Sequence, residues 1–155
     1  MKRTDKQGKL RLSVNKNNTG QTDNGYAGED VALELIKYCL DCDCELRKEN
    51  PCTKGSDLYC LKCNSKYQVK TYGPGNHNQL TDDNTLKQAG PHEIMVETMT
   101  KSKLRYVVLF YDKNKDVVRS VLSSKVKPSD IVSTYGIDKK KCRINLKNVF
   151  VVDYE

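Results

Sequence analysis

A cluster of cysteines constrains the fold of this chain more than any other feature of its sequence. Six of the seven cysteines lie between residues 39 and 63. Two pairs, Cys39-x2-Cys42 and Cys60-x2-Cys63, are separated by 17 intervening residues, a spacing typical of four thiolates around one zinc ion. The first residues, Met1 to Lys6, are not followed by the apolar segment of a secretory signal, so we expect a cytoplasmic protein with reduced thiols. The cysteines therefore predict a structural zinc site.

Other cysteines leave the choice of ligands open at this stage. Cys44 and Cys52 are alternatives to Cys39 and Cys42, and Cys39 is also a candidate for the hydrophobic core because it lies on the apolar face of a predicted helix. The stretch from Cys60 to Asn64 resembles a zinc knuckle, which we expect at the tip of a hairpin. Cys142 has no neighbouring cysteine and is predicted to be a buried reduced thiol.

Hydrophobic periodicity predicts an α/β fold with a mixed central sheet flanked by helices. The first helix is expected over residues 27–40, because Ala32, Leu35, Ile36 and Cys39 recur at helical spacing. Alternation and breaker residues predict strands over 44–49, 57–60, 66–72, 104–111, 117–122 and 148–153, a loop over 73–83, and helices after Gly90-Pro91 and over 128–134. The predicted order is αβββαββαβ. No run of 18 or more apolar residues occurs, so no membrane span is predicted.

Positive charge is concentrated in two places, which favours an anionic partner. The chain has 27 basic and 20 acidic residues, a net charge of +7. We divide it into a basic arm, residues 1–20, and a single domain, residues 21–155. The residues expected to contact DNA phosphates are Lys2, Arg3, Lys6, Lys9, Arg11 and Lys16 in the arm and Lys139, Lys140, Lys141 and Arg143 near the C-terminus.

Four residues form a candidate catalytic group. Glu29 borders the helix face that packs on the sheet, where an acid is costly without a function. Asp57 begins a strand, and Gln68 and Lys70 share one face of the next strand. If the two strands form a hairpin, Glu29, Asp57 and a backbone carbonyl beside Gln68 could hold Mg²⁺ or Mn²⁺, with Lys70 within reach of the attacking water or the scissile phosphate. The group predicts metal-assisted phosphodiester hydrolysis.

This arrangement resembles the PD-(D/E)xK nuclease superfamily. The resemblance is carried by the helix from Gly28 to Ile36, the stretch Gly55-Ser56-Asp57-Leu58 and the stretch Tyr67-Gln68-Val69-Lys70. It implies a restriction-endonuclease-like core, a Mg²⁺-dependent endodeoxyribonuclease and a homodimer, because one active site cuts one strand. Gln68 is similar to the Q-x-K of Mrr-like restriction enzymes and of some homing endonucleases of this fold. Archaeal-type Holliday-junction resolvases are also similar, but they have Glu at the position of Gln68.

Two alternatives stay open on the sequence alone. A neutral Gln68 weakens a Mg²⁺ site, so another acid such as Glu45 or Glu93 is a candidate ligand. The second alternative is a noncatalytic zinc-ribbon protein that binds nucleic acid. It explains the cysteines and the charge, but it gives Glu29, Asp57 and Lys70 no role.

Overall fold

The computed structural model describes residues 10–11 and 20–152, with side chains described from residue 28 onward. The predicted basic arm therefore lies outside the described residues, apart from the backbone of residues 10, 11 and 20. The elements in chain order are β1 (Leu10–Arg11), α1 (Gly20–Ile36), β2 (Leu46–Lys48), β3 (Leu58–Cys60), β4 (Ser65–Tyr72), η1 (Pro74–Gln79), β5 (Thr85–Pro91), α2 (His92–Lys101), β6 (Lys103–Tyr111), β7 (Asp116–Ser123), η2 (Pro128–Asp130), β8 (Ile131–Tyr135), η3 (Ile137–Lys139), β9 (Lys141–Asn145) and β10 (Val149–Val151).

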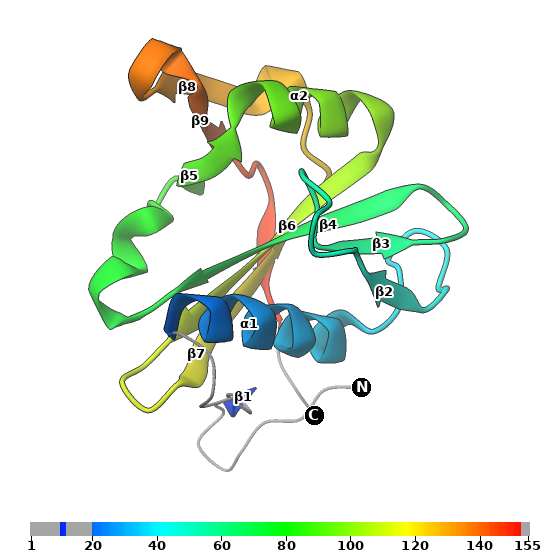
Figure 1. Ribbon diagram of the computed structural model, residues 1–155, viewed down its shortest axis with the longest axis vertical. Helices are drawn as coiled ribbons and strands as arrows, with labels where there is room; N and C mark the ends of the chain where they lie inside the picture. Colours follow the sequence, from blue (N-terminus) through cyan, green and yellow to red (C-terminus); the bar gives the residue numbers. More distant parts are fainter. Residues whose placement is uncertain (1–9, 12–19, 153–155) are drawn as a thin grey trace.

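The larger sheet confirms the predicted α/β class with mixed pairing. Its strand order is β1-β7-β6-β4-β3-β2, and β10 also pairs with β7. β4 and β6 are parallel, whereas the other paired strands in this sheet are antiparallel. A parallel pair requires a crossover connection, and here the chain between β4 and β6 contains η1, β5 and α2 (Figure 1).

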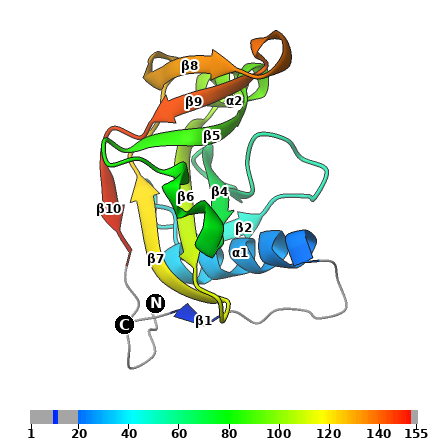
Figure 2. The same cartoon turned by 90° about the vertical axis from the view of Figure 1, so that its left-hand side faces the viewer.

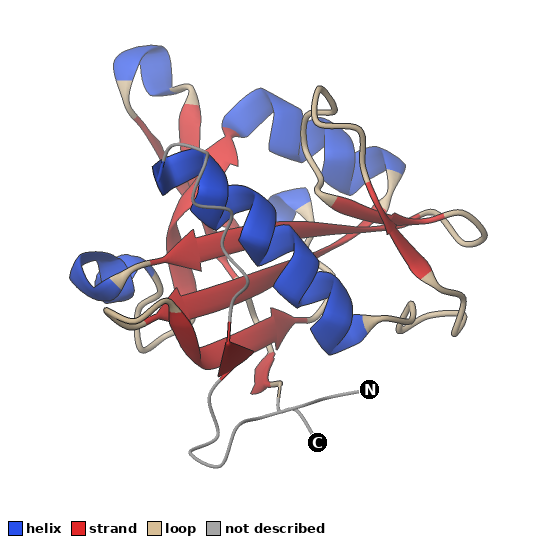
Figure 3. Ribbon diagram, turned by 60° about the horizontal axis from the view of Figure 1, so that its bottom comes forward, coloured by secondary structure: helices blue, strands red, loops and turns tan. Residues whose placement is uncertain are grey.

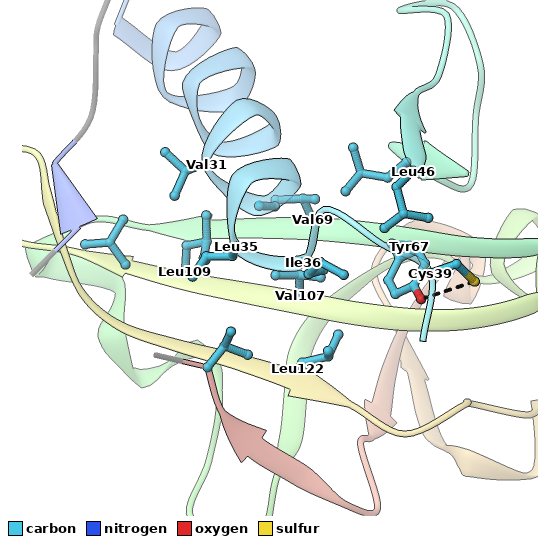
Figure 4. Packing of buried hydrophobic residues seen from close by; sticks show 14 of the residues in the cluster. Val31, Leu35, Ile36, Cys39, Leu46, Tyr67, Val69, Val107, Leu109 and Leu122 are labelled. Atoms are coloured by element: carbon cyan, nitrogen blue, oxygen red, sulfur yellow. Dashed lines mark hydrogen bonds between the residues drawn. The ribbon is translucent and has the colours of Figure 1, made fainter. Parts of the chain in front are cut away.

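Side-chain alternation along β4 and β6 divides the core between the two faces of this sheet. One face packs against α1, whose Val31, Leu35 and Ile36 contact the layer that includes Val69 and Val107 (Figures 3 and 4). The opposite face packs against α2 and the smaller sheet. β6 is buried from Tyr106 to Tyr111 because it is central and covered on both faces, as its continuous apolar sequence predicts.

A second sheet of three antiparallel strands, in the order β5-β9-β8, corrects the predicted element order. The helix predicted over 128–134 is wrong: the chain makes one 3-10 turn, Pro128–Asp130, and continues as strand β8. Strands β5 and β9 were not predicted. The predicted loop over 73–83 contains the 3-10 segment η1. The observed succession of helices and strands therefore differs from αβββαββαβ.

The first helix also differs from its predicted limits. It begins at Gly20 and ends at Ile36, rather than spanning 27–40. Lys37 has a φ of 56°, so the helical conformation stops there. Tyr38 instead bridges Glu45. Cys39 is buried, but it lies in the connection beyond the helix.

Candidate active site and metal centre

The two Cys-x2-Cys pairs meet at one end of the larger sheet. Cys39 and Cys42 follow α1, Cys60 ends β3, and Cys63 lies in the turn before β4. The four Sγ atoms all lie within 4.8 Å of one another, with 3.3 Å between Cys39 and Cys63 and 3.4 Å between Cys42 and Cys60. Four sulfurs around a tetrahedral zinc with bonds of about 2.3 Å lie about 3.8 Å apart. The predicted cluster is confirmed as a group that could hold a metal ion, and its chemistry and size are compatible with zinc.

Neighbouring polar groups hold the cysteine loop against the sheet. The Ser65 hydroxyl lies 3.0 Å from Cys63 Sγ and donates to Asp41 Oδ2 at 2.8 Å. The other Asp41 oxygen lies 3.0 Å from Lys125 Nζ and 3.6 Å from an Arg105 nitrogen. Burial raises the pKa of Asp41, but these hydrogen bonds and cations outweigh it and lower the pKa. The loop is thus tied to β4 and β6.

Two of the thiols are set up to lose their protons. Burial alone raises the pKa of Cys39, but hydrogen bonds from Ser65, from the Asp41 backbone and from Cys63 outweigh it and lower the pKa to about 6. Burial also raises the pKa of Cys60, whereas the backbone N–H groups of Lys62 and Cys63 lower it, with a net lowering. Lys62 N lies 3.4 Å from Cys60 Sγ, as in the predicted knuckle. Thiolates are the form that binds zinc.

The structure also decides between the alternative cysteines. Cys44 packs at the edge of the α1-side core, and its carbonyl accepts a hydrogen bond from Cys39 N at 2.7 Å. Cys52 is exposed in the loop before β3. Neither belongs to the metal-binding group. Cys142 is buried, as predicted, with its thiol 3.4 Å from the Gly90 carbonyl oxygen.

Asp57 occupies the point where β3 separates from β4. The ladder between these strands pairs Leu58 with Tyr67. At Asp57 the backbone ladder ends and the side chain continues the pairing with β4. Asp57 Oδ2 accepts a hydrogen bond of 2.8 Å from Val69 N. The Asp57 backbone N–H donates to the Tyr67 carbonyl at 2.8 Å. The Asp57 carboxylate is therefore fixed at the edge of β4, between the two faces of the sheet.

Glu29 reaches this carboxylate from the helix side. Burial raises the pKa of Glu29, and the charge of Asp57 and a side-chain hydrogen bond between the two carboxyl groups raise it further, to about 7, although Lys48 opposes the shift. Gly28 permits the close approach of α1, because a Cβ at this position would lie 2.4 Å from Thr71 Cγ2 and 3.1 Å from the Tyr111 hydroxyl. A pair of adjoining carboxylates is a site that favours a divalent cation.

Lys70 approaches Asp57 from the opposite side of β4. Strand alternation buries Tyr67 and Val69 beneath α1 and leaves Gln68 and Lys70 half-buried on the other face. Burial lowers the pKa of Lys70, and the negative charge of Asp57 partly restores it. The charge of Asp57 thus acts on both Glu29 and Lys70, and we refer to these three residues as the Glu29 group. Gln68 lies next to them on the Lys70 face of β4.

The alternative acids lie on other elements. Glu45 is exposed where the chain enters β2, and its backbone bridges Tyr38. Glu93 is exposed in the first turn of α2. The acid that sequence reasoning missed is Glu49: it accepts a hydrogen bond from the Ser56 hydroxyl, lies 3.3 Å from Lys66 Nζ, and its backbone N–H donates to the Asp57 carbonyl at 2.9 Å. Glu49 positions the loop that delivers Asp57.

The predicted DNA-contact residues fall in two regions. Lys2, Arg3, Lys6, Lys9 and Lys16 lie outside the described residues, and of Arg11 only the backbone, in β1, is described. Lys139, Lys140, Lys141 and Arg143 lie together at the tip and on the second strand of the β8–β9 hairpin. They are not part of the Glu29 group.

No protein-family model and no curated protein sequence matches this chain. Among the described residues, no helix is long and apolar enough to span a membrane.

Proposed function

We propose that this protein is a divalent-metal-dependent DNA endonuclease with a restriction-endonuclease-like core, in which Glu29 and Asp57 bind Mg²⁺ or Mn²⁺. The observation that carries the proposal is the contact between these two carboxyl groups at the point where β3 leaves β4, with Lys70 on the other side of Asp57. Two half-buried carboxyl groups beside each other are costly to a fold, as the raised pKa of Glu29 indicates. A bound cation would offset this cost.

Asp57 and Lys70 then have different roles in phosphodiester hydrolysis. A bound divalent cation supplies Lewis acidity to the scissile phosphate and activates water. The hydrogen bond from Val69 N–H fixes the Asp57 carboxylate, which with Glu29 would hold the cation. The Lys70 ammonium balances the charge that develops on the phosphate, and its lowered pKa lets it exchange a proton with the attacking water more readily than an exposed lysine. Water adds across one P–O bond of the backbone, leaving a phosphate and a hydroxyl end.

Zinc at the cysteine cluster has a structural part in this proposal. The four thiolates connect the end of α1, which carries Glu29, to the β3–β4 hairpin, which carries Asp57, Gln68 and Lys70. A tetrahedral site filled by four cysteines has no open position for a substrate. The zinc would therefore hold the catalytic elements together rather than act on DNA.

The wider role follows from the DNA substrate. We propose a homodimer that cuts both strands of a duplex, and a restriction-like or homing-like enzyme is favoured by Gln68. A Holliday-junction resolvase is the alternative within the same chemistry. Cleavage of a linear duplex compared with a four-way junction separates the two roles.

Supercoiled plasmid DNA provides the test of the proposed function. The wild-type protein is expected to nick and linearise the plasmid in Mg²⁺ or Mn²⁺, whereas Asp57→Asn and Lys70→Ala abolish cleavage. The amide oxygen introduced by Asp57→Asn can still accept the hydrogen bond from Val69 N, so the fold is expected to persist. The matched control is Asp30→Asn, which neutralises the exposed acid next to Glu29 that pairs with Lys48 at 2.8 Å; it is expected to cleave.

Two outcomes would contradict the proposal. Equal cleavage by wild type and by Asp57→Asn would remove this site. Tight DNA binding without cleavage in any divalent metal, unchanged by Asp57→Asn, would favour the noncatalytic zinc-ribbon protein.

A further inference from the structure

The β8–β9 hairpin has the composition and shape of an element that enters a DNA groove. Its turn and second strand, residues 136–143, contain four basic residues and one acid. Lys139, Lys140 and Lys141 are exposed, whereas Cys142 and Ile144 point into the core beneath them. The hairpin is therefore anchored on one face and basic on the other, and the major groove of DNA admits a two-stranded ribbon of this width.

The tip of this hairpin presents an isolated apolar side chain. Ile137 is 86% exposed, more than any other large hydrophobic residue in the described part of the chain. It is held out by a tight turn in which Gly136, Asp138 and Lys139 have φ values of 84°, 56° and 53°. Lys139 N donates to the Gly136 carbonyl at 3.0 Å, and the Lys140 carbonyl accepts a hydrogen bond of 2.6 Å from His92 N at the start of α2. The projection of Ile137 is thus built into a supported turn.

The outer face of the hairpin carries a pre-positioned arginine. Arg143 lies over the Tyr135 ring, with its guanidinium carbon 4.1 Å from the ring centroid, and one of its nitrogens is 3.5 Å from the Ser133 hydroxyl. Strand pairing explains this contact, because Ser133 lies opposite Arg143 and Tyr135 opposite Lys141. An arginine held by an aromatic ring loses less rotational freedom on binding. The same face continues into a depression of mixed charge, lined by Thr81, Asp82, Asp83, Thr85, Lys87, Val132, Arg143 and Asn145.

The hairpin projects from the molecule on the same side as the start of α1. Figure 2 shows the turn between β8 and β9 and the N-terminal end of α1 extending to this side, with β4 between them. A DNA duplex lying along this side would meet the hairpin.

We infer that the β8–β9 hairpin inserts into a groove of double-stranded DNA, with Ile137 as a wedge between stacked base pairs and Lys139, Lys140 and Arg143 on the flanking backbone. The inference rests on the proposed DNA substrate. The hairpin exposes two large apolar side chains, Ile137 at the tip and Val132 on β8, which are too few for a protein interface core. The position of Ile137 matches proteins that insert a single apolar residue and unstack a base step. Cations alone would give nonspecific backbone binding. The wedge adds a distortion whose cost depends on the base step, and hence a source of sequence preference.

The test uses the full chain in Ca²⁺ in place of Mg²⁺, so that binding is measured without cleavage. The probes are short duplexes that carry the fluorescent base 2-aminopurine at each position in turn. Wild-type protein is expected to raise the fluorescence severalfold at one or a few positions when binding is saturated. Ile137→Ser is expected to lose this rise while keeping the salt dependence of binding.

Two further variants separate the wedge from the cations. The double variant Lys139→Gln/Lys140→Gln is expected to reduce the slope of the logarithm of the DNA-binding constant against the logarithm of the salt concentration by about one per lysine. It is expected to keep the fluorescence rise at saturation. Val151→Ser is the matched control for loss of an exposed apolar side chain, because Val151 is 57% exposed on β10 of the larger sheet; it is expected to behave as wild type.

Several outcomes would overturn the inference. The first is a saturated wild-type complex with no fluorescence rise, and the second is an unchanged rise with Ile137→Ser. The third is that anionic vesicles bind wild type but not Ile137→Ser, while the two proteins bind DNA equally. Cleavage by wild type without unstacking would reject the wedge and leave the nuclease. Unstacking without cleavage in Mg²⁺ or Mn²⁺ would reject the nuclease and leave the wedge.

Discussion

The carboxyl group of Glu29, on α1, lies against that of Asp57, the residue before β3, and Asp57 raises the pKa of Glu29. The two residues are distant in sequence and come from the helix and the hairpin that the cysteine cluster connects. Their contact makes proton binding, metal binding and folding of this region interdependent.

Metal binding is expected to depend on pH through Glu29. The pKa of Glu29 is raised to about 7, chiefly by burial and by Asp57, so below pH 7 a cation must displace a proton. The apparent affinity for Mn²⁺ should therefore rise by about tenfold per pH unit between pH 5 and pH 7 and level off above it. Calorimetric titration checks this, and Glu29→Gln should remove the dependence. A flat profile in the wild type would contradict the pairing.

The stability of the metal-free protein should change in the same range. A folded-state pKa above the unfolded value of 4.5 means that the folded chain holds a proton that the unfolded chain has lost. The contribution of Glu29 to stability is thus fully present below about pH 4.5 and is lost as pH rises through 7. Urea unfolding at pH 5 and pH 8 should show this loss, and Mn²⁺ should diminish it at pH 8. Glu97→Gln, which neutralises an exposed acid on α2, should preserve both effects.

The contact between Gly28 and Thr71 should govern the spacing of α1 and β4. A Cβ at Gly28 would lie 2.4 Å from Thr71 Cγ2, so Gly28→Ala is expected to destabilise the fold by about 1–3 kcal/mol despite its better helix propensity. Thr71→Ser removes the clashing methyl group, and the double variant should recover most of the loss in a double-mutant cycle. Gly73→Ala, where a Cβ meets nothing within 4 Å, is the control. Additive effects of the two substitutions would contradict the contact.

Removal of zinc should disassemble the catalytic group. Structural zinc contributes about 10–16 kcal/mol of apparent binding free energy in small zinc-dependent peptides, as much as the whole stability of a typical domain. Cys60→Ser is expected to lose bound zinc, to melt at a much lower temperature and to lose cleavage. Cys52→Ser, an exposed cysteine outside the cluster, is expected to keep all three. Metal analysis showing the same zinc content in both variants would reject the cluster as the site.

A negative charge at position 68 should strengthen the metal site. Gln68 lies between Tyr67 and Val69, the two β4 residues whose backbone groups bond Asp57, and its side chain is on the Lys70 face. Gln68→Glu is therefore expected to add a third carboxylate to the proposed site. We expect tighter Mg²⁺ binding, with a lower Mg²⁺ concentration needed for half-maximal cleavage. Lys66→Glu, which places the charge on the same face nearer the cysteine turn, should not tighten it. Unchanged Mg²⁺ dependence of Gln68→Glu would place position 68 outside the metal site.

The sequence predicts secondary structure and strand faces correctly where the spacing of the apolar residues matches one kind of element. The alternation of Tyr67 and Val69 against Gln68 and Lys70 gave the correct faces of β4, and the apolar run from Leu104 to Tyr111 gave β6. The spacing of the cysteines identified their cluster, although the choice of Cys39 over Cys44 depended on the reversal of the chain after Lys37. The contact between Glu29 and Asp57 depends on the close approach at Gly28, which spacing alone does not encode.

The second sheet was missed because its strands carry misleading signals. β5 ends in Gly90-Pro91, which is typical of a chain break, and the ladder has an irregularity before Gly90. The helix predicted over 128–134 is replaced by a single 3-10 turn at Pro128, and the β-branched residues after that turn form β8. In β9 a signal was present: Cys142 and Ile144 alternate with Lys141 and Arg143, but the lysines were interpreted as a charged cluster alone.

Anomalous diffraction from crystals soaked in Mn²⁺ is the most direct test of metal binding by Glu29 and Asp57. We expect a Mn²⁺ peak in contact with the carboxylates of both Glu29 and Asp57, and a separate zinc peak among the four cysteines. The Mn²⁺ peak should be absent from Asp57→Asn crystals. Wild-type crystals without Mn²⁺ at these carboxylates, under conditions in which the protein cleaves DNA, would contradict the proposed metal binding.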